Sequence, residues 1–153
     1  MSRSPARAFE DALLSERVVE RTLKASLRNQ IEKLYDAYAA KNYWGDDEMV
    51  EQRVSYAEQN ADRFEKETGT DIRDPQVKKK YESDIRQVLK TKAMKWLEDS
   101  ADKIARKDLP WMLKSIRYDQ KVMKDLFKIV TGQDIKNLSS TKLKPVLEAY
   151  AAS

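Results

Sequence analysis

The sequence contains no histidine and no cysteine, and its 153 residues include only three glycines and four prolines. Without histidine and cysteine, the chain lacks the most common general base, the thiol nucleophile, disulfide bonds and the usual ligands of zinc. Three glycines cannot form a glycine-rich phosphate-binding loop, and the motif GxxxxGK[ST] is absent. We therefore expect a protein that is not an enzyme, with no metal or other cofactor and no small-molecule substrate.

The sequence also lacks any apolar run close to the roughly 18 residues that a membrane-spanning helix requires. Its first residues do not form the apolar core of a secretory signal peptide. Residues 1–9 are rich in arginine and serine, as in an organellar transit peptide, but acidic residues follow at Glu10, Asp11, Glu16 and Glu20. We expect a soluble, intracellular protein of the cytoplasm, without a transmembrane segment.

Charged residues are abundant and unevenly distributed. They make up 37% of the chain, and the formal net charge is +4. Residues 1–41 carry eight basic and six acidic side chains, residues 42–76 carry four and ten, and residues 77–153 carry eighteen and ten. This asymmetry predicts either a polyanionic partner or ion pairing between segments of the chain.

High charge with few glycines and prolines is typical of long, exposed helices, and the apolar residues recur at helical spacing. We expect an all-α fold, an elongated bundle of about five helices that forms a single helical domain over residues 1–153. The first helix is predicted to be long and to run to about Lys41, with residues 1–20 as an overhanging arm. Its apolar stripe consists of Phe9, Leu13, Val19, Leu23, Leu27, Ile31, Leu34 and Tyr38.

Two acidic residues, Glu16 and Glu20, lie within this apolar stripe. An unpaired carboxylate is costly to bury. Either the arm leaves both residues in water, or they meet basic residues of another helix or another chain.

The segment NYWGDD is predicted to be a connection, with Asp46 or Asp47 as the cap of a second helix that ends at Gly69. The acidic run that ends at Glu48 is interpreted as a helix start and not as a metal site, because it lacks the alternating oxygen ligands of a calcium loop. The expected buried residues of this helix are Val50, Val54, Ala57, Ala61 and Phe64. An acidic stripe lies beside them and consists of Glu51, Glu58, Asp62 and Glu65.

A third helix is predicted to begin at Asp74 and Pro75. Its apolar side changes along the chain, from Val77, Tyr81, Ile85 and Val88 to Ala93, Leu97, Ala101 and Ile104. We expect a break or kink near Thr91; the alternative is a continuous helix that meets different neighbours along its two halves. Opposite the first apolar face lies a group that we interpret as solvated surface, Lys79, Arg86 and Lys90.

A fourth, central amphipathic helix is predicted over residues 111–130, beginning at Asp108 and Pro110. One edge is a basic stripe at spacings of three and four, which consists of Lys114, Arg117, Lys121, Lys124 and Lys128. Apolar residues flank the stripe on both sides, with Leu113, Ile116, Met123, Phe127 and Val130 on one flank and Trp111, Tyr118, Val122 and Ile129 on the other. A helix that is apolar on two sides is usually central to a bundle or shared with a partner. Gly132 is expected to end it, and residues 133–153 to contain a short C-terminal helix.

The basic stripe has three possible destinations: water, the acidic stripe of the second helix, or an external polyanion. Exposed ion pairs contribute only about 0 to 1 kcal/mol each. Pairing between the two stripes would therefore select the register and the partner of the helices more than it would stabilise them.

Two functions are compatible with these patterns. The leading hypothesis is a noncatalytic helical interaction protein, a subunit or adaptor in a larger protein assembly or a homo-oligomer, with its interface on the flank of Trp111, Tyr118, Val122 and Ile129. The alternative is a sequence-tolerant nucleic-acid-binding protein whose basic stripe contacts phosphates. Trp111 and Tyr118 lie on an apolar face, where core packing is favoured over base stacking.

Overall fold

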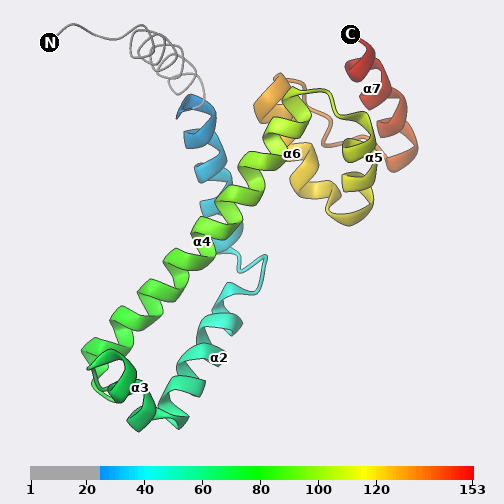
Figure 1. The fold of residues 1–153 in the computed structure, drawn as a ribbon. Helices are drawn as coiled ribbons and strands as arrows, with labels where there is room; N and C mark the ends of the chain where they lie inside the picture. The colour runs from blue at the N-terminus through cyan, green and yellow to red at the C-terminus, as the bar shows by residue number, and fades with distance from the viewer. Residues whose placement is uncertain (1–24) are drawn as a thin grey trace, which may run out of the picture. The chain divides into compact units, whose positions relative to one another are not determined.

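The computed structural model describes residues 25–153, and all regular secondary structure in this range is helical (Figure 1). The all-α prediction is therefore confirmed for these residues. The N-terminal helix is described from residue 25 to residue 40, and it is followed by α2 (Asp46–Gln59), α3 (Ala61–Thr68), α4 (Pro75–Ala105), α5 (Leu109–Tyr118), α6 (Gln120–Thr131) and α7 (Ser140–Ala152). The predicted arm over residues 1–20, including Glu16 and Glu20, lies outside the described range.

The described helices number seven instead of about five, because two of the predicted helices are each divided in two. The chain divides into two compact units. The single helical domain over residues 1–153 stays a prediction. One unit comprises residues 34–99, and the other comprises residues 100–153 together with the segment that ends at residue 33. We call them the middle unit and the C-terminal unit.

In the middle unit, α2 lies beside the first part of α4 (Figure 1). Val50 and Val54 of α2 form a buried cluster with Ile85 of α4. Farther along α2, a second cluster consists of Ala57, Ala61 and Ile72, with Phe64 and Tyr81 packed against it. The predicted buried stripe of the second helix is therefore largely correct, although Phe64 is only partly buried.

The predicted second helix is divided at Asn60, so the expectation of one continuous helix to Gly69 is wrong. The Asn60 amide side chain donates a hydrogen bond to the Tyr56 carbonyl at 2.9 Å, and its backbone has φ −119° and ψ 40°. A short polar side chain that bonds to nearby backbone competes with helix propagation. Gly69, in the left-handed region at φ 75°, does end α3 as predicted.

The start of α2 differs from the predicted cap. Asp46 and Asp47 lie inside the first turn of α2, and Gly45 occupies the N-cap position at φ 72°. The Asn42 side-chain oxygen accepts a hydrogen bond from the Asp47 amide at 3.0 Å, and the Asn42 amide nitrogen donates to the Glu48 carboxylate. The connection therefore supplies the cap, and the acidic residues favour the positive end of the helix dipole.

The third predicted helix runs without interruption through Thr91, so the expected break is wrong. The Thr91 hydroxyl donates to the Gln87 carbonyl at 2.9 Å, which satisfies it inside the helix. The helix is buried on different sides along its length, at Ile85 in its first half and at Leu97 in its second half. The change of apolar face therefore reflects a change of surroundings along one continuous helix.

The C-terminal unit packs α5 against α6 and α7. Its core contains large apolar side chains that are almost fully buried, including Ile104, Met112, Met123, Leu126, Phe127, Ile135, Leu143 and Leu147. The Tyr150 hydroxyl donates to the Ile104 carbonyl at 2.8 Å, and the Tyr150 ring meets the Phe127 ring edge to face at 5.1 Å between ring centroids. These contacts hold α7 to the end of α4 and to α6.

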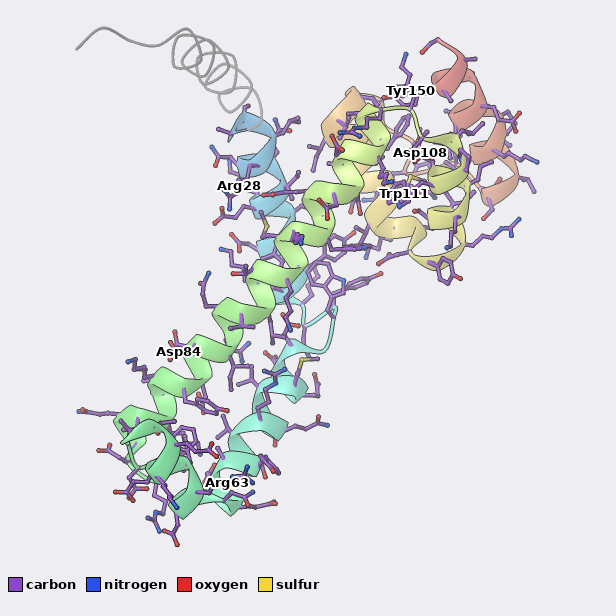
Figure 2. The ribbon with its side chains drawn as sticks, viewed as in Figure 1. Arg28, Arg63, Asp84, Asp108, Trp111 and Tyr150 are labelled. Atoms are coloured by element: carbon purple, nitrogen blue, oxygen red, sulfur yellow. The ribbon has the colours of Figure 1, made fainter. Side chains whose placement is uncertain are left out.

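The segment 111–130 is not one helix, and this is the main correction to the sequence analysis. α5 ends at Tyr118 and α6 begins at Gln120, with Asp119 between them at φ −145° and ψ 74°. The Asp119 carboxylate accepts a hydrogen bond from the Val122 amide at 3.3 Å, which makes Asp119 the N-cap of α6. The predicted start of the preceding helix at Asp108 and Pro110 is confirmed, and the Asp108 side chain caps it by accepting from the Trp111 amide at 3.1 Å (Figure 2).

We expect Asp119→Ala to lower the free energy of unfolding by about 1 kcal/mol, because it leaves the first amides of α6 without their capping acceptor. The measurement is urea denaturation followed by circular dichroism. Asp84→Ala is the matched control, since Asp84 is an exposed acidic residue within α4 (Figure 2). A loss for Asp119→Ala no larger than that for Asp84→Ala would contradict the capping role.

Candidate functional site

The basic stripe does not exist as one line of charge. Lys114 and Arg117 lie on α5, whereas Lys121, Lys124 and Lys128 lie on α6 beyond the break at Asp119. The prediction of five cations along a single helix is therefore wrong. The individual side chains nevertheless have distinct surroundings, because two of them contact the connection between α6 and α7.

Two of the five cations are used inside the C-terminal unit. The Lys124 ammonium donates to the Leu138 carbonyl at 2.8 Å and to the Lys136 carbonyl at 3.2 Å. The Lys128 ammonium lies 3.5 Å from the Asp134 carboxylate. Both contacts join the connection between α6 and α7 to α6. These two cations therefore have partners within the fold.

The pKa of the Asp134 carboxyl is lowered by this environment. The largest cause is the hydrogen bond from the Lys136 amide, which is 2.9 Å long, and the nearby charge of Lys128 contributes in the same direction. The carboxylate stays ionised at neutral pH. It therefore contacts both the Lys136 backbone amide within the connection and the Lys128 side chain of α6.

The other three cations lie near the junction of α5 and α6, and one of them contacts a tyrosine at the end of α5. Lys114, Arg117 and Lys121 have exposed side chains. Tyr118 is 81% exposed, and the Lys114 ammonium lies over its ring at 5.9 Å from the centroid. We call Lys114, Arg117 and Tyr118 the α5 patch.

The predicted interface flank is not one surface. Val122 is fully buried at 0% exposure, so it belongs to the core and cannot contact a partner. Trp111 and Ile129 are partly buried, and Tyr118 alone is highly exposed. The break at Asp119 explains this result. Because α6 starts as a new helix, its residues do not continue the faces of α5 as they would in one helix.

The acidic stripe has partners within the middle unit. The Lys78 ammonium lies 3.3 Å from the Glu58 carboxylate, and the Arg73 guanidinium lies 3.5 Å from Asp62 and 3.9 Å from Glu65. All of these side chains are substantially exposed, so each pair contributes little to stability. Glu51 lines a shallow hollow of about 370 Å³ between α2 and α4.

Arg73 has its shortest ion pair with Asp71, at 2.8 Å. The Asp71 carboxylate also accepts from the Arg73 backbone amide at 3.0 Å. The side-chain hydrogen bond is the largest cause that lowers the pKa of Asp71 and raises the pKa of Arg73. This pair fixes the turn that joins α3 to α4.

The lysine-rich face of α4 lines a second hollow, of about 430 Å³, with the N-terminal helix and the start of α2. Its residues include Lys79, Arg86 and Lys90, which the sequence assigned to solvated surface. Arg86 lies 2.9 Å from Asp47, and Lys90 lies 3.7 Å from Asp36. Arg86 and Lys90 therefore take part in ion pairs that connect α4 to its neighbours.

An aromatic cluster at the end of the N-terminal helix was not predicted. The Tyr35 ring stacks on Trp44 at 5.6 Å, and Tyr38 lies 4.7 Å from Tyr43 and 5.4 Å from Trp44, all between ring centroids. The only sequence signal was two aromatic residues inside NYWGDD, a segment interpreted as a simple connection. The cluster makes this connection a packed element of the middle unit.

Tyr35 links the aromatic cluster to charged residues. Its hydroxyl donates to the Asp46 carboxylate at 3.3 Å, and the Lys90 ammonium lies 5.8 Å from the centre of its ring. Burial is the largest cause that raises the pKa of Tyr35, followed by the negative charge of Asp46. The hydroxyl is therefore protonated at neutral pH and acts as a hydrogen-bond donor.

Over residues 25–153, no group of three or more acidic side chains is placed to hold a metal ion. None of the helices described there is both long enough and apolar enough to cross a membrane. Neither a protein-family model, nor a curated protein, nor a solved structure matches the chain. Function is therefore inferred from the exposed side chains and their surroundings.

We expect Lys124→Met to lower the free energy of unfolding by about 1 kcal/mol, because it removes a charged donor from two carbonyls while keeping the length of the side chain. Urea denaturation measures the change. Lys114→Met is the control in the same unit, because the Lys114 side chain is exposed and its ammonium lies over the exposed ring of Tyr118. Equal stability of the two variants would show that the carbonyl contacts of Lys124 contribute nothing.

Replacing Arg73 by glutamine should raise the pKa of Asp71 toward its ordinary value, as measured by an NMR pH titration of the carboxyl carbon. Because the folded-state pKa of Asp71 is depressed, its ionised form stabilises the fold above about pH 4, and this contribution disappears as the pH falls through the folded-state pKa. The stability difference between Arg73→Gln and the wild type should therefore shrink in acid. Arg63→Gln, which affects the pair with Glu67, should leave the pKa of Asp71 unchanged; a shift there, or none in Arg73→Gln, would contradict the assignment.

Proposed function

We propose that the protein is a noncatalytic helical interaction protein that acts as a subunit or adaptor in a larger protein assembly. The observation that best supports this proposal is an exposed stripe on α2. Met49 is 39% exposed and Tyr56 is 64% exposed. These residues are seven positions apart, which brings them to within about 20° of each other around the helix.

The side of α2 that carries this stripe differs from the side that builds the core. Arg53 lies between Met49 and Tyr56 on the same side and is also exposed. The core residue Val50 follows Met49, and the core residue Val54 follows Arg53. Each core residue therefore lies about 100° around the helix from the stripe residue before it. The stripe is therefore available to a partner without any loss of the packing against α4.

The residue types of the stripe fit a protein interface. Tyrosine, methionine and arginine are enriched in interface cores, whereas lysine and glutamate are depleted. Single exposed apolar residues are common and need no explanation, but aligned ones that share a helix side favour a contact surface. The buried cluster of Val50, Val54 and Ile85 holds this helix on α4. A partner would thus meet a preorganised surface.

The test compares the wild type with Met49→Lys/Tyr56→Lys and with the control Thr91→Lys, which adds a charge at an exposed position of α4 in the same unit. Each protein is recovered from its native cells, treated with nuclease, and analysed by mass spectrometry and by light scattering over a range of concentrations. The wild type and the control should keep a defined protein partner or self-associate. The double variant should bind at least about tenfold more weakly, because aromatic anchors commonly contribute more than 1 to 2 kcal/mol.

Two results would contradict this proposal. One is a wild type that is a concentration-independent monomer and loses every companion protein after nuclease. The other is a double variant that associates as tightly as the control while its circular dichroism and unfolding remain those of the wild type.

A further inference from the structure

We propose that the α5 patch, Lys114, Arg117 and Tyr118, binds single-stranded nucleic acid by stacking an unpaired base on Tyr118 and contacting the neighbouring phosphates with the two cations. The patch lies in the C-terminal unit, on a different helix from the stripe on α2. The inference therefore goes beyond the proposed function and does not depend on it.

The first support is the exposure of the Tyr118 ring. At 81% it is the most exposed large apolar or aromatic side chain in residues 25–153. Core packing, which the sequence favoured for this residue, is therefore wrong. Tyr118 is the last residue of α5, and the buried Met112 lies about 120° away around the helix. The core of the unit does not need the ring, which can present a face to a ligand.

The second support is the charge around the ring. Lys114 and Arg117 are exposed on the same helix, and no acidic residue occurs in α5. The Lys114 ammonium is 5.9 Å from the ring centroid, close to the roughly 6 Å limit for cation–π attraction. This attraction is weak, so the ammonium can move to a phosphate when a base stacks on the ring. Residues 100–153 carry eleven basic and six acidic side chains, which adds a favourable field for an anionic strand.

The nearest acidic side chain along the chain has a role within the fold. Asp119 follows Tyr118 directly, but its carboxylate accepts the Val122 amide as the cap of α6. That hydrogen bond places the negative charge at the positive end of the α6 dipole. The local negative charge is thus partly compensated within the fold.

An aromatic side chain with adjacent cations selects among polyanions. In a duplex, the bases are already stacked on one another, so a surface tyrosine can contact only the backbone or the ends. An acidic peptide offers charge but no base. A single strand offers both, and stacking of a base on an aromatic side chain is worth about 1 to 3 kcal/mol while tolerating any sequence. The geometry therefore favours an unpaired strand over a duplex.

Fluorescence anisotropy with labelled oligothymidylate and oligouridylate of about twelve nucleotides, within the 4 to 16 nucleotides that single-strand-binding sites usually cover, tests the proposal at low salt. We expect both strands to bind, and Tyr118→Ala to weaken binding by about 5- to 150-fold, the range that corresponds to the loss of one stacked base. Tyr118→Phe should retain most of the affinity, since the ring is preserved. Tyr56→Ala is the matched control, because it removes another exposed tyrosine, at 64% exposure, from the other unit.

The role of charge is tested separately. Lys114→Gln/Arg117→Gln should reduce the slope of log affinity against log salt by about 0.7 for each phosphate that is no longer neutralised. Lys142→Gln/Lys144→Gln removes two exposed lysines of α7 from the same unit and should leave affinity and slope closer to those of the wild type.

Several results would overturn the assignment. They are a wild type that binds neither strand, equal binding of Tyr118→Ala and Tyr56→Ala, or a duplex or polyglutamate that binds as tightly as the single strand. The stability of Tyr118→Ala is checked by thermal unfolding, and Tyr118→Phe keeps the test valid if the alanine variant is unstable. Met49→Lys/Tyr56→Lys should bind the oligonucleotides as the wild type does, so failure of either proposal leaves the other testable.

Discussion

The hydrogen bond from the Val122 amide to the Asp119 carboxylate is the constraint on which the arrangement of the C-terminal unit depends. It caps a new helix that begins at Gln120, two residues after α5 ends, and on either side of this restart Val122 is buried and Tyr118 lies in solvent. It also separates Lys114 from Lys124, so that one faces water beside an aromatic ring while the other binds carbonyls. If one helix continued through Asp119, Lys114 and Lys124 would lie along the same charged edge.

The helix starts and stops that rest on local chemistry were predictable. Asp108 caps its own helix, and Gly69 and Gly132 each end a helix with positive φ, as their residue types require. The breaks at Asn60 and Asp119 were not predicted, because apolar residues continue at helical spacing on both sides of each one. Periodicity identifies which residues face a core, but a short polar side chain can restart a helix without disturbing that pattern.

The roles of the charged side chains depended on contacts between distant parts of the sequence. Lys124 binds carbonyls twelve and fourteen residues away, and Arg86 pairs with Asp47 across two helices. Charge runs in the sequence indicate where cations are, but not which of them the fold uses. The aromatic cluster of Tyr35 and Trp44 was missed for the same reason, since its stacking requires the connection to fold back on the helix.

Both junctions between the compact units fall inside helices. One lies between residues 33 and 34 of the N-terminal helix, and the other lies between residues 99 and 100 of α4. A fragment cut at these positions would begin and end in mid-helix and would leave up to about four backbone amides or carbonyls at each cut without their helical partners. The units are distinct in their packing, yet neither can be excised as an independent piece of chain without damaging its own ends.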